Sequence, residues 1–360
     1  MNQRSQREWS LDAARATLLV LGIVLHTGNI YAVGSGWLVK DSESNAAFNW
    51  LVAFIHIFRV PGFFWLSGFF CGLTYAKVGF VRTLKDRYLR LGVPLLFTWV
   101  VINRVQEFVM AGGDWTALTP WGQLTPLYHL WFLVDLAVML PSIGLVKVAF
   151  DGMLFSAVFR YLGAVHWFFL MLFLTVFSMG ISLLVRVSGL GYFDLMGLTT
   201  LFRLANGLPY FIAGFLMFNL PSLRQKYYSV PIPAIIFAAI LGPMLEVLLP
   251  RLNGMEGELK NSANILIVWV LIAAVLRLCQ VLFRNGSRSL GLVVAASYSI
   301  YLLHHVCVIA LGLAVMHLGL PAWIKFLFVC TFTFSLTVLA HHFLIARIGA
   351  LRFLLNGRMK

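Results

Sequence analysis

The stretch that decides the fold is residues 11–33, LDAARATLLVLGIVLHTGNIYAV, an apolar run long enough to cross a bilayer as one helix. Asp12 and Arg15 lie one turn apart and can pair. Arg15 and His26 are eleven residues apart, about three full turns, so both project from one face with about 16 Å of axial rise between them. Ionisable groups in lipid usually face a bundle interior. The stretch therefore predicts a membrane helix with a functional polar stripe; the alternative is that Arg15 only anchors the helix at the membrane edge with Asp12 as its partner.

The composition of the whole chain agrees with a membrane protein. The 360 residues are 61% hydrophobic and only 11% charged, with a mean hydropathy of +0.89, whereas a soluble domain carries about 25% charged residues. This excludes an ordinary cytosolic enzyme, a disordered protein and a solenoid of polar repeats. The net charge of +14 does not indicate a nucleic-acid partner, because an excess of Lys and Arg in a membrane protein reports its orientation. The four cysteines have no paired spacing, so we expect neither a disulfide framework nor a metal cluster.

The apolar runs predict an all-α polytopic membrane protein, a bundle of about ten transmembrane helices that forms one domain over residues 1–360. Seventeen Lys and Arg residues fall in the termini and alternate loops on one side, and five fall on the other. This asymmetry predicts that both termini are cytoplasmic. The expected spans are 11–33, 48–76, 89–110, 127–146, 164–185, 204–220, 231–250, 264–283, 292–316 and 322–346.

The second span carries His56 and Arg59, which are three residues apart and share a helix face. Arg59 lies about eleven residues into the span, too deep to reach water comfortably, so it needs an anion or a carbonyl as partner. The stretch 61–70 that follows holds Ser67 among small and aromatic residues. Its small residues indicate either a functional segment or simply close helix packing, and both readings stay open.

A basic run, residues 81–90, precedes the third span, and its Arg87 and Arg90 share a helical face. One interpretation is a cytoplasmic loop against anionic lipid headgroups. The other is a phosphate site, because the guanidinium fork suits phosphate oxygens. Within the third span, Arg104 and Glu107 are spaced to pair with each other.

Two further spans carry polar side chains. The fourth begins at His129 and Trp131 and contains Asp135, and the ninth contains the adjacent pair His304 and His305. Because neighbouring residues on a helix point about 100° apart, we expect only one of that pair to face the interior. No two histidines have the i, i+3 or i, i+4 spacing of helical metal ligands, so we predict no metal site. No P-loop, G-x-S-x-G or dinucleotide fingerprint is present, which disfavours a nucleotide-driven pump and an α/β-hydrolase.

Taken together, these segments resemble the membrane-bound acyltransferase family 3. The family's first-helix motif matches Leu11-Asp12-Ala13-Ala14-Arg15 with His26, and its Phe-Phe-x-x-Ser-Gly-Phe motif matches residues 63–69. Its Arg-x-x-Arg, His-Leu-Trp-Phe-Leu and Ser-Tyr-x-x-Tyr-Leu-x-His segments match residues 87–90, 129–133 and 297–304. Five motifs in order along nearly the whole chain make this resemblance fairly specific.

Within that family the sequence is most similar to a branch implicated in succinylating osmoregulated periplasmic glucans of Gram-negative bacteria. Arg7-Glu8, the segment 54–59 and the doubled His304-His305 carry the closer match. The resemblance implies a multi-pass protein of the bacterial inner membrane. It also implies succinyl-CoA as co-substrate without a permanently bound cofactor, a periplasmic glucan as acceptor, and His26 as a catalytic residue.

The residues suggest how such a transfer could run. Arg87, Arg90 and Arg15 would hold the donor on the cytoplasmic side, and His26, toward the outer half, would take the proton from a sugar hydroxyl as general base. Arg59 is the candidate partner of the succinyl carboxylate. Arg15, His56 and His304 are further catalytic candidates, and a transient acyl-histidine stays open. The expected supporting residues are Asp12, Ser67, His129, Trp131, Asp135, Tyr298, Tyr301 and His305.

Two alternatives stay open at this point. Intramembrane His, Arg and Asp also mark carriers, so the chain could be a transporter or exporter of the glucan or of an organic anion. Inverted repeats with broken helices would favour a carrier, and the sequence shows none. The second alternative is an acyltransferase with another acyl group or another glycan acceptor. The oligomeric state is open.

Overall fold

The computed structural model describes residues 8–120, 123, 125–151, 161, 163–249, 252 and 254–358. Arg4, Arg7, Arg160, Arg251 and Lys360, which contributed to the charge asymmetry, lie outside these residues. Eight described helices are long and apolar enough to cross a membrane, and two bent helix pairs bring the number of candidate spans to as many as ten. The all-helical, multi-pass architecture is thereby confirmed.

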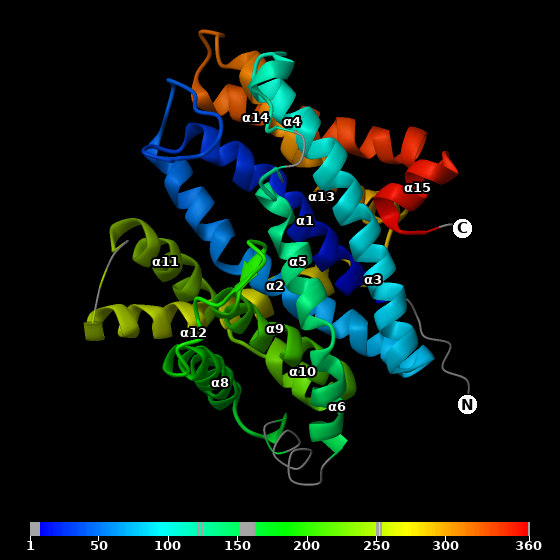
Figure 1. Ribbon diagram of the computed structural model, residues 1–360. Helices are drawn as coiled ribbons and strands as arrows, with labels where there is room; N and C mark the ends of the chain where they lie inside the picture. Colours follow the sequence, from blue (N-terminus) through cyan, green and yellow to red (C-terminus); the bar gives the residue numbers. More distant parts are fainter. Residues whose placement is uncertain are drawn as a thin grey trace.

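The helices and strands follow one another along the chain as Figure 1 colours them. The α-helices are α1 (Trp9–Tyr31), α2 (Ala46–Val78), α3 (Phe80–Phe97), α4 (Asn103–Met110), α5 (Trp131–Met139), α6 (Ser142–Asp151), α8 (Trp167–Val187), α9 (Leu201–Asn219), α10 (Pro221–Tyr228), α11 (Ile232–Leu248), α12 (Gly254–Leu282), α13 (Arg288–Val315), α14 (Ala322–Ala340) and α15 (Gly349–Asn356). The shorter elements are η1 (Thr98–Ile102), η2 (Trp115–Ala117), η3 (Tyr128–Leu130), η4 (His341–Ile345), β1 (Asp194–Leu195) and β2 (Thr199–Thr200).

The basic run before the third span is part of a helix and not a loop, while its contact with lipid headgroups stays a prediction. α2 ends at Val78, and Gly79 reverses the chain with φ +76°, a backbone angle that L side chains rarely adopt. α3 then begins at once at Phe80, so Arg87 and Arg90 lie on a regular helix that starts nine residues before the span expected at 89–110.

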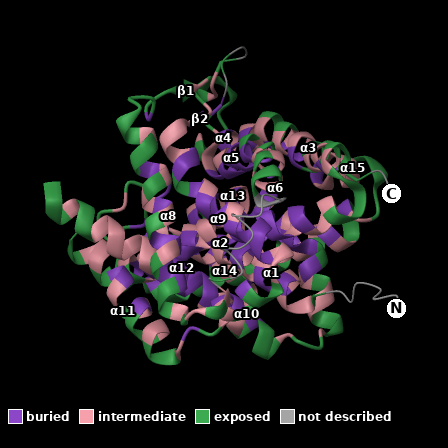
Figure 2. Cartoon of the chain, turned by 90° about the horizontal axis from the view of Figure 1, so that it is seen from below, coloured by how far each residue is buried: buried purple, intermediate pink, exposed green. Residues whose placement is uncertain are grey.

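α1 is the central helix of the bundle. It packs against α2, α12, α13 and α14, and Figure 1 shows it crossing the middle of the molecule. Most of its side chains are buried, and the buried residues gather in the interior in Figure 2. A helix that is surrounded on several sides can place polar groups in a protein interior without exposing them to lipid.

α2 and α9 cross in close contact through two glycines. A Cβ at Gly68 of α2 would collide with the backbone carbonyl of Phe211, and one at Gly214 of α9 would collide with the carbonyl of Trp65. Each helix therefore presents a glycine to the backbone of the other. The structure supports the close-packing reading for the small residues around Ser67, which is buried and is not among the residues lining the cavity described below.

Described parts of three segments predicted to be cytoplasmic meet at the N-terminal end of α1. Glu8 forms an ion pair with Arg224 of α10 (3.4 Å), and Trp9 lies beside Gly286 between α12 and α13. At the opposite end of α1, Asp41 forms a buried ion pair with Lys325 at the start of α14 (2.9 Å). The two faces agree with the charge asymmetry, while the cytoplasmic assignment itself stays a prediction.

A π-helical turn, η1, interrupts the third span. The backbone N–H of Asn103 donates to the carbonyl of Thr98, five residues earlier. Such a turn inserts one extra residue into an α-helix and so changes which face the following residues present. After it, Gln106 and Glu107 are buried, and Val105 between Arg104 and Gln106 is exposed.

Candidate active site

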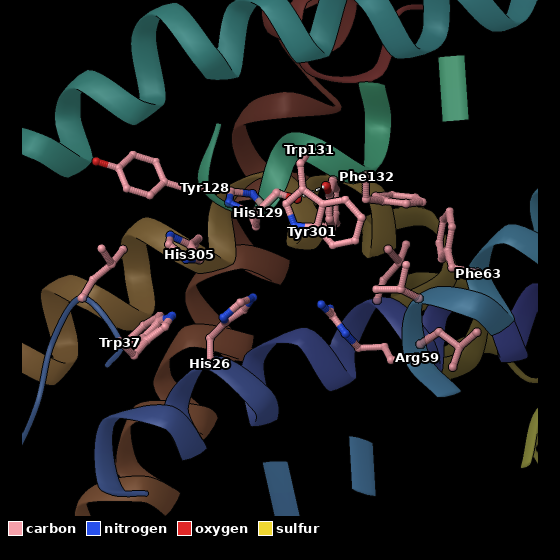
Figure 3. A pocket seen from close by; sticks show the side chains of 14 residues that line it. His26, Trp37, Arg59, Phe63, Tyr128, His129, Trp131, Phe132, Tyr301 and His305 are labelled. Atoms are coloured by element: carbon pink, nitrogen blue, oxygen red, sulfur yellow. Dashed lines mark hydrogen bonds between the residues drawn. The ribbon is translucent and has the colours of Figure 1, made fainter. Parts of the chain in front are cut away.

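A cavity of about 230 Å³ lies between α1, α2, η3, α5 and α13. Figure 3 shows His26 and Arg59 pointing into it from one side, with His129 and Tyr301 on the other. Its walls are aromatic and aliphatic with a few basic groups, and none of the described lining residues is acidic. The lining residues are Leu18, Leu19, His26, Trp37, Leu38, Arg59, Val60, Phe63, Tyr128, His129, Trp131, Phe132, Tyr301 and His305.

Four histidines from three elements lie close together, and three of them, His26, His129 and His305, line this cavity. The ring centroid of His26 lies 4.8 Å from that of His305 and 5.3 Å from that of His304. His129 stacks on His305 at 4.7 Å, and its backbone carbonyl accepts a hydrogen bond from the hydroxyl of Tyr301 (2.8 Å). Neither ring nitrogen of His26 has a hydrogen-bond partner among the described residues. His26 is thus free to bond a ligand in the cavity.

The expectation that only one histidine of the adjacent pair faces the interior is wrong. Both side chains are buried. α13 packs against other helices on several sides, so two neighbouring side chains that point about 100° apart both reach the protein interior. His304 donates from Nδ1 to the carbonyls of Tyr301 (2.7 Å) and Ile300 (3.1 Å) of its own helix. His305 instead bonds from Nδ1 to Oε1 of Gln106 on α4 (2.6 Å), and only His305 of the two lines the cavity.

Arg59 is a cation without an anion among the described residues. No hydrogen bond or ion pair joins it to any of them, and its Nε is buried. It reaches the cavity over Gly22 of α1: a Cβ there would lie 2.6 Å from Nη1 of Arg59 and 3.0 Å from Nε2 of His304. Gly22 therefore provides the space in which the guanidinium and His304 come together. None of the residues that the structure describes supplies the anion or carbonyl that Arg59 is expected to need.

Asp135 is structural, because it is fully buried and binds Arg203 of α9. Nε and Nη2 of Arg203 donate to its carboxylate at 2.9 Å and 3.0 Å, the two-pronged geometry that makes such pairs strong. The guanidinium carbon of Arg203 also lies 5.0 Å from the ring centre of Trp131, a lining residue. The pair thus fixes Trp131 in the cavity wall.

Arg15 and Arg87 both contact Phe70 of α2. Arg15 pairs with Asp12 at 3.1 Å, as predicted, and its guanidinium carbon lies 4.9 Å from the ring centre of Phe70. Nη2 of Arg87 donates to the carbonyl of Phe70 (2.7 Å) and to the hydroxyl of Thr74 (3.0 Å). Arg15 and Arg87 therefore lie on either side of Phe70. Arg15 is about one helical turn of α1 before Leu18 and Leu19, which line the cavity.

Arg90 is exposed, and its carbonyl accepts a hydrogen bond from the hydroxyl of Tyr298 (3.1 Å). It also lies beside Gly357 just after α15. The predicted pair of Arg104 and Glu107 is present (3.5 Å). His56 is not brought to the cavity: it is exposed on α2, and its position gives it no contact with His26.

Several residues at the cavity were not predicted. Gln106 is an uncharged polar residue between Arg104 and Glu107. The spacing of that charged pair predicts an ion pair but gives no role to Gln106. Trp37, in the loop after α1, stacks on His26 with 5.6 Å between the ring centroids. The sequence of a loop does not indicate which distant residue its aromatic side chain will contact. The other residues that were not singled out are Leu18, Leu19, Gly22, Leu38, Val60, Phe63, Tyr128 and Phe132, of which Phe63 and Phe132 lie within the matched motif segments.

The arrangement suits the handling of an anionic or carbonyl-bearing ligand. Three imidazoles, one guanidinium and two phenols line the cavity, so it offers proton acceptors and donors to a reacting group. Among the residues that the structure describes, no group of three or more His, Cys, Asp or Glu is arranged to hold a metal ion.

Comparison with known proteins adds the family. Residues 8–342 match the family profile described as an acyltransferase domain. Glucans biosynthesis protein C from Escherichia coli K12 is 26% identical over 386 aligned residues, which cover 98% of this chain and 95% of that protein. The proteins of the same name from E. coli O1:K1 and from E. coli O45:K1 strain S88 match with the same identity and coverage. No solved structure matches the chain significantly. With nearly all of its length matched, and with its helical bundle, this chain belongs to the acyltransferase 3 family of membrane proteins.

Proposed function

We propose that this acyltransferase moves a succinyl group from cytoplasmic succinyl-CoA to a hydroxyl of a periplasmic glucan, in the inner membrane of a bacterium. The observation that carries the proposal is the cavity that His26 and Arg59 both line. Among the described residues, neither ring nitrogen of His26 has a hydrogen-bond partner and Arg59 has no anion. The full-length similarity to glucans biosynthesis protein C supports a glucan as acceptor.

In the proposed step, His26 is the general base. Its free nitrogen takes the proton of the sugar hydroxyl while the hydroxyl oxygen attacks the thioester carbonyl carbon. The tetrahedral intermediate collapses, the carbon–sulfur bond breaks, and the thiolate of coenzyme A takes the proton from His26. The new ester bond joins the acyl group to the sugar. No described Ser or Cys lines the cavity, which favours this direct transfer over an acyl-enzyme on either residue.

The donor would reach the cavity from the N-terminal face of the bundle. Arg90 and the remaining donors of Arg87 would bind its phosphates, since an Arg fork matches phosphate oxygens. Arg15 lies between that face and the cavity, along the path of the pantetheine arm. This placement agrees with the separation of a cytoplasmic donor from a periplasmic acceptor.

Arg59 would bind the carboxylate at the far end of a succinyl group. A buried guanidinium left without an anion is costly, so a neutral acetyl end would gain less from this site. We expect Arg59→Ala to reduce succinyl transfer more than any residual acetyl transfer. Equal losses for the two donors would argue against this role.

Mass spectrometry of periplasmic glucans tests the function. Cells that lack the protein are complemented with wild type, with His26→Ala, or with His317→Ala, an exposed histidine outside the cavity as matched control. We expect a succinyl-sized mass increment with wild type and the control but not with His26→Ala. Glucan export that changes while its mass does not would favour a transporter instead.

A further inference from the structure

The hydrogen bond between His305 and Gln106 decides which nitrogen of His305 can accept a proton. The amide oxygen Oε1 of Gln106 has only lone pairs, so Nδ1 of His305, at 2.6 Å, carries the hydrogen. A neutral imidazole has one N–H and one lone pair, so the lone pair belongs to Nε2. His305 lines the cavity. Its bond to Gln106 therefore makes Nε2 of His305 a fixed hydrogen-bond acceptor for a group in the cavity.

The other histidines do not offer a fixed acceptor at the cavity. His304 is also oriented through Nδ1, but it does not line the cavity, and its Nε2 is directed at Gly22 and Arg59. His129 has no hydrogen-bond partner on either ring nitrogen among the described residues. His305 is therefore the one described histidine that both lines the cavity and has its tautomer set by the protein.

The partner that needs this acceptor is His26. Its ring lies 4.8 Å from His305 between centroids, closer than to His304, with the two planes at 81°. When His26 takes a proton it becomes a donor on both nitrogens, and no described acidic residue lines the cavity to receive the second N–H. Arg59, His129, His304 and Tyr128 also surround His305, and none of them is an anion near neutral pH.

We infer that Gln106, His305 and His26 form a hydrogen-bonded chain during transfer, in which His305 and Gln106 are positioning residues for the base. This inference rests on the proposed function. One nitrogen of His26 takes the hydroxyl proton, and its other N–H donates to Nε2 of His305, whose Nδ1–H donates to Gln106. The proton stays on His26 until the thiolate of coenzyme A takes it, so His305 remains neutral throughout. A base oriented by another group is the usual design of such sites.

Paired substitutions separate positioning from structure. In His305→Asn the side-chain amide can replace Nδ1 as donor to Gln106, but nothing replaces Nε2. In His305→Gln the amide oxygen can replace Nε2 as acceptor. Gln106→Leu removes the acceptor for Nδ1 at similar size, and Gln106→Glu keeps it. Purified monodisperse protein is assayed for coenzyme A release from succinyl-CoA, with glucan from a strain that lacks the protein as acceptor.

We expect His305→Asn and Gln106→Leu to lower kcat about a hundredfold, the loss that a misplacement of about 1 Å can cause, with the KM of both substrates unchanged. His305→Gln and Gln106→Glu should retain kcat within about tenfold of wild type. Wild-type kcat in His305→Asn, or equal losses in Gln106→Leu and Gln106→Glu, would overturn the inference.

A double-mutant cycle shows whether His305 acts through His26. Groups that act as a unit are non-additive, so His26→Ala/His305→Asn should be no slower than His26→Ala alone. Losses that multiply would overturn the inference. If His26→Ala keeps full kcat, the proposed base is wrong and the inference fails with it. If His26→Ala is inactive while His305→Asn is fully active, only the inference fails.

Discussion

Gly22→Ala should impair the transferase through Arg59 without unfolding the protein. The added Cβ would lie 2.6 Å from Nη1 of Arg59 and 3.0 Å from Nε2 of His304, whereas ordinary contacts begin at 3.4 Å. His304 is held by two carbonyls of its own helix. Most of the adjustment therefore falls on the guanidinium, which must move by at least 0.8 Å.

A shift of this size in a substrate-binding group costs about a hundredfold in rate, or about 2.7 kcal/mol at the transition state. We expect that loss in kcat/KM with succinyl-CoA and a smaller loss with acetyl-CoA, because only the former bears a carboxylate for Arg59. Overpacking of this kind costs about 1–3 kcal/mol of stability, so the variant should still purify as a folded protein.

Two variants sharpen the test. Gly180→Ala on α8, where a Cβ would meet nothing within 4 Å, is the matched helical control and should keep full activity. Adding Arg59→Lys to Gly22→Ala removes Nη1, and with it the closest contact, so part of the succinyl transfer should return. A Gly22→Ala enzyme with wild-type succinyl transfer would refute the packing argument.

Three further predictions concern other parts of the bundle. Lys325→Met should lower the free energy of unfolding by about 3–5 kcal/mol, because it leaves the buried Asp41 carboxylate without its cation, and the loss should appear as a lower Tm in detergent. Replacing both residues by apolar ones should lower stability less; equal losses would contradict the argument. Gly68→Ala should prevent folding, since its Cβ would strike a backbone carbonyl of α9, whereas Gly92→Ala meets nothing within 4 Å; size-exclusion chromatography distinguishes the two. Arg87→Gln keeps a side-chain donor for α2 but loses the charge, so the KM for the acyl-CoA should rise about tenfold, about 1.4 kcal/mol of binding, with kcat unchanged; an unchanged KM would remove Arg87 from the donor site.

The sequence predicts the spans well because a bilayer constrains both the length and the composition of each helix. It also predicts the pair of Asp12 and Arg15, since an i, i+3 pair depends only on one helix. The pairs of Asp135 with Arg203 and of Asp41 with Lys325 were not predicted. Each joins residues far apart in the chain, and hydropathy does not say which helices become neighbours.

The candidate site was predicted in part. His26 and Arg59 were predicted because an ionisable group inside a membrane span is energetically costly and usually has a functional or pairing role. Gln106 is uncharged and gave no such signal, and its partner His305 is set by how α4 packs on α13. His56 looked equivalent to Arg59 by spacing, yet it is exposed, because two residues on one helix face need not both face the same neighbour.

The π-helical turn η1 divides the third span into two segments whose rotational phases are set independently. α3 is phased so that Arg87 meets α2, and α4, one extra residue later, is phased so that Gln106 meets His305. Deleting one residue of the turn, such as the exposed Val100, would restore a continuous α-helix and rotate Gln106 by about 100° away from the histidines. A single inserted residue thus separates the orientation of Arg87 toward α2 from the orientation of Gln106 toward His305.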